Sequence, residues 1–200
     1  MMSPMKKLLA IIILSLCFIT PSQADDIRDF QIEGMSVGES LLKYMTESEI
    51  KNSKRNYQKG KKRYYVVYTL KNINTYDVVD IYLKTGDKNY EIKTLGGLIT
   101  IHNKKDCLKK RKEIVNELRE IFEDSKLVEY ENTKHHFDKS GKSRTYQSAF
   151  LLKNNNNKDH VRVECTFWGK KMKKKNKFSD NLNVVAYSSE ILNWFADGYN

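Results

Sequence analysis

The chain has 200 residues, which suits one domain around a single hydrophobic core. Its 36 basic and 25 acidic side chains give a net charge of +11, so anionic surfaces such as lipid headgroups or lipopolysaccharide are favoured partners. Lysines far outnumber arginines, which argues against nucleic acid as the partner, because paired recognition of phosphates favours arginine.

Residues 1–24 have the three parts of a secretory signal peptide. Two lysines precede an uncharged run over residues 8–20, and a proline ends that run. Ser22 and Ala24 are small residues at the positions that a signal peptidase reads, so cleavage is predicted between Ala24 and Asp25. The run is shorter than the roughly 20 apolar residues that span a bilayer.

Two alternatives to cleavage stay open. An uncleaved run would anchor the chain, and a lipoprotein would need a lipid-modified cysteine, for which Cys17 is the candidate. Cleavage would leave residues 25–200 as a single soluble domain without a transmembrane segment. We expect that domain to be periplasmic or secreted.

The first half of this domain predicts one short helix and three strands. Ser36 and Glu39 have capping-box spacing, which predicts a helix over about 37–50, followed by a polar linker over 51–62. Strands are expected at 64–70, 78–83 and 90–101, with turns at 72–75 and 85–88. Gly96-Gly97 suggests that the third strand is bulged or split.

The second half predicts a long helix, three more strands and a final helix. Asn103 is placed to cap a helix over 104–124, and 125–142 and 170–177 are expected to be loops. The strands are expected at 145–152, 160–168 and 182–187, with a turn at 154–157 and a last helix over 189–196. The predicted class is therefore α+β, an antiparallel sheet of about six strands in two meanders with helices packed on one face.

Two cysteines, Cys107 and Cys165, remain after cleavage. Cys107 lies on the apolar face of the long helix, and Cys165 alternates with valines on the buried face of a strand. We predict that they form a disulfide, as expected in an oxidising compartment, with two buried free thiols as the alternative. Cys107 also lies near a helix N-terminus, where a thiol can be reactive, but its buried face favours a structural role.

A dense group of lysines is the candidate anionic-surface patch. Six of the eight residues from 170 to 177 are lysines: Lys170, Lys171, Lys173, Lys174, Lys175 and Lys177. A second basic cluster comprises Lys104, Lys105, Lys109, Lys110, Arg111 and Lys112. The nearby rings of Phe167, Trp168 and Phe178 would suit anchoring at an interface. The preferred interpretation is a solvated loop whose composition reflects coding drift, and the anionic-surface patch is the competing one.

Few residues suggest catalysis. His135-His136 with Asp138 could begin a metal site, but adjacent residues rarely ligate one ion, so a solvated loop is the preferred interpretation. His102 and His160 fall at strand ends. No phosphate-binding glycine loop, nucleophile elbow or zinc-protease motif is present, so no catalytic, metal or cofactor residue is predicted.

One stretch resembles a known family. The sequence Ile-Glu-Gly-Met-Ser-Val-Gly-Glu-Ser-Leu-Leu over residues 32–42 resembles the strand, Gly-Met-Ser and short helix that open small exported α+β proteins of the β-lactamase-inhibitor-like group and its outer-membrane-assembly lipoprotein relatives. The resemblance covers about eleven residues. It implies a binding or scaffolding module rather than an enzyme.

These observations favour a non-enzymatic binding or accessory module of the cell envelope, for a partner protein or an anionic envelope component. A small basic secreted hydrolase or nuclease is the alternative, and a purely structural accessory protein is a third. Convergence of two histidines with an acid in one cleft would favour the enzyme.

Overall fold

The structure is a computed structural model that describes residues 26–55, 62–69, 75–153 and 159–198. The predicted signal peptide with its Ala24–Asp25 cleavage site, the turn at 154–157 and most of the turn at 72–75 lie outside these ranges. The fold class is α+β, as predicted, and the protein is built on an antiparallel sheet.

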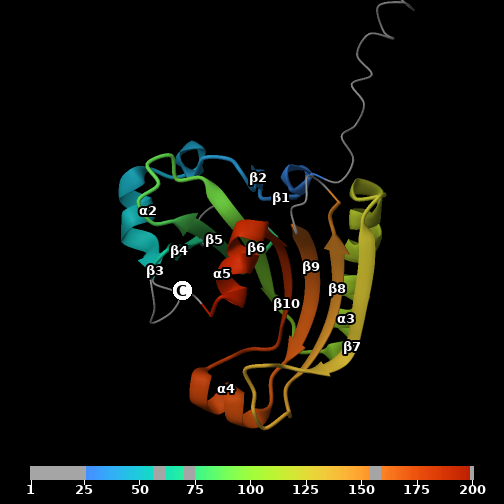
Figure 1. The fold of residues 1–200 in the computed structure, drawn as a ribbon. Helices are drawn as coiled ribbons and strands as arrows, with labels where there is room; N and C mark the ends of the chain where they lie inside the picture. The colour runs from blue at the N-terminus through green and yellow to red at the C-terminus, as the bar shows by residue number, and fades with distance from the viewer. Residues whose placement is uncertain (1–25, 56–61, 70–74, 154–158, 199–200) are drawn as a thin grey trace, which may run out of the picture.

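The main sheet has the strand order β3-β4-β5-β6-β10-β9-β8-β7, and all neighbours are antiparallel (Figure 1). Its strands are β3 (Lys54–Arg55), β4 (Tyr64–Thr69), β5 (Val78–Lys84), β6 (Ile92–Thr100), β7 (Lys126–Lys134), β8 (Arg144–Leu151), β9 (His160–Phe167) and β10 (Asn181–Tyr187). Two runs of consecutive strands meet where β6 pairs with β10. The prediction of about six strands was too low, since each run gains a strand, β3 or β7, at its outer edge.

Strand β7 was predicted to be part of a loop. Among the strands that the structure describes, it lies at an edge of the sheet and pairs with β8 alone. Most of its side chains are exposed, so it lacks the alternating apolar pattern by which a strand is recognised. Residues 170–177, the other predicted loop, contain the helix α4 (Lys170–Asn176), which ends at Lys177 in the left-handed conformation. Lysine is a good helix former, which explains this local structure.

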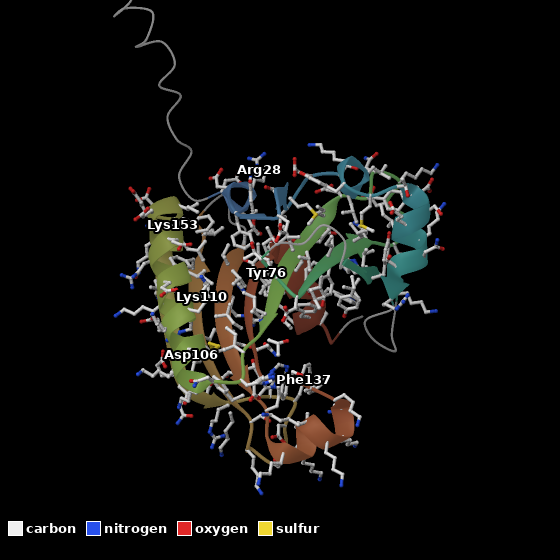
Figure 2. All side chains as sticks on the ribbon, turned by 180° about the vertical axis from the view of Figure 1, so that it is seen from behind. Arg28, Tyr76, Asp106, Lys110, Phe137 and Lys153 are labelled. Atoms are coloured by element: carbon white, nitrogen blue, oxygen red, sulfur yellow. A yellow bond between two sulfur atoms is a disulfide. The ribbon has the colours of Figure 1, made fainter. Side chains whose placement is uncertain are left out.

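The helices α3 (Lys104–Ile121) and α5 (Ser189–Ala196) pack on opposite faces of the sheet. Figure 1 shows α5 in front of β6 and β10, whereas Figure 2, from behind, shows α3 in front. The prediction that all helices share one face was therefore wrong. Successive residues of a strand point to opposite faces of the sheet. In β10, Val184 joins the core under α3, and Val185 packs with α5 on the other face.

The larger core lies between the sheet, α3 and the N-terminal segment. This segment contains η2 (Ile27–Asp29), the two-stranded sheet of β1 (Gln31–Ile32) and β2 (Met35–Ser36), η3 (Leu41–Lys43) and α2 (Glu47–Ser53). The predicted cap of α3 is confirmed, because the Asn103 side chain accepts hydrogen bonds from the Lys105 and Asp106 amides. The predicted disulfide is also confirmed: Cys107 of α3 is bonded to Cys165 of β9 in the core.

The helix predicted over 37–50 does not form as one element. Glu39 does accept a hydrogen bond from the Ser36 amide, but Ser36 belongs to β2 and the chain then turns. Gly38 has a φ of +89°, which is not helical, and its amide donates to the carbonyl of Ile92. The capping box is found later, between Thr46 and Glu49 at the start of α2.

The glycine pair in β6 neither bulges nor splits the strand, contrary to prediction. β6 pairs without a break at Gly96 and Gly97, and the register shift lies near Tyr82. A Cβ on Gly96 would lie 2.4 Å from Oδ1 of Asp80, and one on Gly97 would lie 2.5 Å from the Tyr76 ring. The two glycines thus leave space for side chains from the opposite faces of the sheet.

Candidate functional site

Helix α5 covers only part of its face of the sheet, and a groove of about 790 Å³ opens beside it. We call this the sheet groove. Its floor consists of side chains from β5, β6, β10, β9 and β8, and its walls are α5 and the end of β7. Strand register determines which side chains lie beside one another on this floor.

Polar side chains form rows across neighbouring strands. In one row Asn183 of β10 is opposite Glu164 of β9, which is opposite Gln147 of β8. The adjacent row, two residues further along each strand, contains Asn181, Thr166, Thr145 and Thr133. Neighbouring strands are about 4.8 Å apart, so each row presents hydrogen-bonding groups at that spacing. The Oδ1 atom of Asn183 is buried and has no hydrogen-bond partner among the described residues.

The groove contains charges of both signs. Arg162 donates to the Tyr187 hydroxyl at 2.7 Å, and its guanidinium lies over the Tyr187 ring. Burial raises the pKa of Asp80 to about 6, against the attraction of Arg162. Burial, together with Arg162, lowers the pKa of His160 to about 4. With Glu164 and Lys134 also on the lining, the acidic and basic side chains are balanced.

One end of the groove carries a cluster of rings, which we call the aromatic cluster: His135, His136, Phe137, Trp168 and Phe178. The His135 ring centroid lies 4.3 Å from that of Trp168 and 4.8 Å from that of His136. His136 contacts Phe137 at 4.0 Å, and Trp168 contacts Phe178 at 4.5 Å. The interpretation of His135-His136 as a solvated loop was therefore incomplete, because His135 is half-buried between two rings.

Asp138 holds the turn that carries these rings. Its carboxylate accepts hydrogen bonds from the hydroxyls and amides of Ser140 and Ser143, which hold the pKa of Asp138 well below its usual range. The Asp138 carboxylate is therefore engaged in hydrogen bonds within its own loop. Within the described ranges, no three His, Cys, Asp or Glu side chains form a metal-binding group.

The six lysines of the predicted patch are all exposed, on α4 and just after it. Lys173 forms an ion pair with Asp180 at 2.6 Å. The Gly169 amide donates to Ser143 Oγ at 2.9 Å, which attaches the start of α4 to the turn that carries Phe137. The lysines and the aromatic cluster therefore lie at one end of the molecule, the basic end (Figures 1 and 2).

The candidate interface rings differ in exposure. Phe137 is 48% exposed and Phe178 is 37% exposed. Trp168 is half-buried, and Phe167 packs on Tyr146 against the core, so Phe167 does not face an interface. Phe137, which the sequence did not suggest as an anchor, takes its place.

The second basic cluster, on α3, is partly withdrawn from solvent. Arg111 is buried and forms an ion pair with Glu131, and Lys104 donates to the Tyr146 hydroxyl. Lys109 and Lys110 lie within 4.0 Å of Glu113. The lysines on and just after α4 therefore form the denser group of exposed positive charges. No helix in the described part of the chain has both the length and the apolar character needed to cross a bilayer.

Sequence reasoning missed the sheet groove. The available signal was the alternation in β9, where His160, Arg162 and Glu164 alternate with the buried residues Val161, Val163 and Cys165. β9 is a central strand, so its polar face must lie on the sheet away from the core. Finding that face required the position of the strand in the sheet, which the local pattern does not contain.

Two histidines and an acid do meet in one cleft, since His135, His136 and Glu164 all line the groove. Burial lowers the pKa of His135, and the Glu164 carboxylate opposes this shift. His135 Nδ1 accepts the amide hydrogen of Phe137 at 3.2 Å, which fixes the ring in its turn. The arrangement places a half-buried imidazole in the same groove as a carboxylate.

Comparisons with protein-family models, with curated proteins and with solved structures gave no match to this chain.

Proposed function

We propose that the protein is a non-enzymatic binding module of the cell envelope that attaches to anionic phospholipid surfaces through its basic end. The observation that carries the proposal is the combination of exposed lysines on α4 with the exposed rings of Phe137 and Phe178 at the same end. The disulfide supports an oxidising compartment, which agrees with the predicted export to the periplasm or the medium.

The physical basis is additive electrostatic attraction with shallow insertion of rings. Each lysine near an acidic membrane contributes about 1 kcal/mol. Lys173 is already paired with Asp180, so five of the six lysines supply this attraction. Aromatic side chains favour the boundary between headgroups and acyl chains, where Phe137 and Phe178 would add apolar contact.

Vesicle sedimentation tests the proposal directly. We expect the purified protein to sediment with vesicles that contain phosphatidylglycerol, to remain free with phosphatidylcholine alone, and to dissociate as salt is raised. A Lys171→Gln/Lys174→Gln/Lys175→Gln variant should bind at least tenfold more weakly, because three attractive charges are removed.

The matched control removes three lysines elsewhere. Lys88 lies beside α2, and Lys126 and Lys153 lie at the end of the sheet away from α4; all three are exposed, and Lys88→Gln/Lys126→Gln/Lys153→Gln makes the same change in net charge. Equal loss in both triple variants would show a general charge effect and reject the basic end as the contact surface. Binding to lipopolysaccharide micelles without binding to phosphatidylglycerol vesicles would reassign the anionic partner.

A hydrolase or nuclease remains the second candidate because His135, His136 and Glu164 line one groove. A purified preparation should then cleave single-stranded or double-stranded nucleic acid, or a generic ester, in an assay without added metal and again with added magnesium. His135→Gln would abolish that activity. Activity that persists in this variant would come from another site or from a contaminant.

A further inference from the structure

The sheet groove offers recognition chemistry that differs from that of the basic end. Its floor carries side-chain amides, hydroxyls and carboxyls in register, and its acidic and basic groups balance. A balanced lining gives no net attraction for an anion. Whatever binds here is therefore selected by hydrogen bonds rather than by charge.

The central row supplies the most specific contacts. Asn183, Glu164 and Gln147 lie side by side on β10, β9 and β8, so an amide, a carboxylate and a second amide span about 10 Å. Asn183 Oδ1 is buried without a hydrogen-bond partner among the described residues. The side chains of Asn183, Glu164 and Gln147 are each partly exposed on the groove lining, so their amide and carboxyl groups can meet the hydroxyls of a ligand.

A polypeptide strand cannot extend the sheet at this position. β8, β9 and β10 each pair with a neighbour on both sides, and the edges of the sheet are β3 and β7. The backbone groups of the floor strands are thus already used, and recognition must be made by side chains. This favours a ligand that carries its own donors and acceptors along its length.

Rings flank the polar rows at both ends. Tyr187 and Phe195 lie at the α5 end, and His135 and Trp168 lie at the other. Sugar rings combine hydroxyl edges with apolar C–H faces, so they match polar floors that are flanked by aromatic side chains. We propose that the sheet groove binds a neutral oligosaccharide, with its hydroxyls on the row Asn183–Glu164–Gln147.

This inference goes beyond the proposed attachment to membranes and does not depend on it. Isothermal titration with cellohexaose, chitohexaose and maltohexaose provides the test, and Trp168 gives a second readout through its fluorescence because it lines the groove. At least one hexasaccharide should bind. Asn183→Leu should then weaken binding by about tenfold, because it removes one of the two amides of the row.

The matched control is Asn116→Leu, the same change at an exposed position of α3, which should leave affinity unchanged. Far-ultraviolet circular dichroism and thermal unfolding of both variants separate loss of binding from loss of fold, and Gln147→Leu provides a second variant in the row. Absence of binding by all three sugars, or full affinity in both groove variants, overturns the proposal. A serine- and asparagine-rich dodecapeptide that binds when the sugars do not, and that is lost with Asn183→Leu, would assign the groove to a polypeptide instead.

The lysine triple variant distinguishes the two proposals. Lys171→Gln/Lys174→Gln/Lys175→Gln should keep its affinity for sugar while losing vesicle binding. Loss of sugar binding in that variant would show that the groove and the basic end act as one site.

Discussion

Asp80→Asn should stabilise the protein at neutral pH. The Asp80 carboxyl lies over Gly96 in the groove floor, and burial raises its pKa from an ordinary 3.8 to about 6. An acid whose pKa is higher in the folded protein than in the unfolded chain favours folding fully below the unfolded pKa. That contribution is lost as pH rises through the folded pKa.

The magnitude follows from the size of the shift. A difference of about two pKa units corresponds to about 3 kcal/mol at pH 7.5, where the charged carboxylate is held in the fold. Asp80 is partly exposed to the solvent in the groove, so about 3 kcal/mol is the upper limit of this destabilisation. Asparagine has nearly the same shape as aspartate without the charge, so Asp80→Asn should recover most of this free energy of unfolding at pH 7.5. At pH 4 the unmodified protein and the variant should differ little in stability.

His160 titrates in the opposite direction over the same range. Its pKa is lowered to about 4, so its contribution to stability is complete above pH 6.5 and falls as pH falls toward 4. The two effects are similar in size and nearly cancel between pH 4 and 6.5. The unmodified protein should therefore have a flat profile there, and Asp80→Asn should show the acid sensitivity that His160 causes.

Urea denaturation at half-unit steps from pH 4 to 8 measures both effects as the free energy of unfolding. Asp124→Asn, the same change in an exposed turn, is the control and should follow the unmodified protein. If Asp80→Asn gains nothing at pH 7.5, or if its gain is the same at pH 4, then Asp80 does not carry a buried charge and the reasoning fails.

Two further changes test the core and the α5 face. Replacing Cys107 and Cys165 with serine should lower the free energy of unfolding by about 4 kcal/mol, because the bond closes a loop of 58 residues. Reduction of the unmodified protein should reproduce that loss in urea denaturation, and a double variant as stable as the oxidised protein would contradict it. Glu190→Gln should cost about 1 kcal/mol at pH 7: although burial alone would raise the pKa of Glu190, the Tyr64 hydroxyl and Lys84 lower it to about 2. That difference should be present above pH 4.5 and shrink as pH falls toward 2, so a difference independent of pH would rule out the ionic contribution.

The parts of the fold that could be predicted are those whose burial follows a local period. The helix over residues 104–121 repeats apolar residues on one face, and Asn103 marks its beginning. The disulfide could be predicted because Cys107 and Cys165 each lie on the buried face of their own element. Both inferences need only the neighbouring residues.

The elements that were missed depend on tertiary position. β7 is exposed along most of its length, and its backbone pairs with β8 at the edge of the sheet. Helix α5 lies opposite α3 because it packs on the face of β10 that carries Val185. The local sequence does not show which face of the strand a helix will cover. The sheet groove has the same origin, because the polar face of β9 becomes a floor only when β8 and β10 lie beside it.

The two faces of the sheet explain why a binding site can exist where the sequence showed none. The α3 face carries the larger core, and on the other face a smaller apolar cluster forms where Tyr64 and Val185 pack against Trp194 of α5. Beyond α5, the same face presents Asn183, whose buried acceptor is unsatisfied. A protein that needed only a stable sheet would gain by covering this area with apolar residues, because buried polar groups without partners weaken the fold. The row residues Asn183, Glu164 and Gln147 are partly exposed beside α5, and the proposed sugar site depends on that exposure.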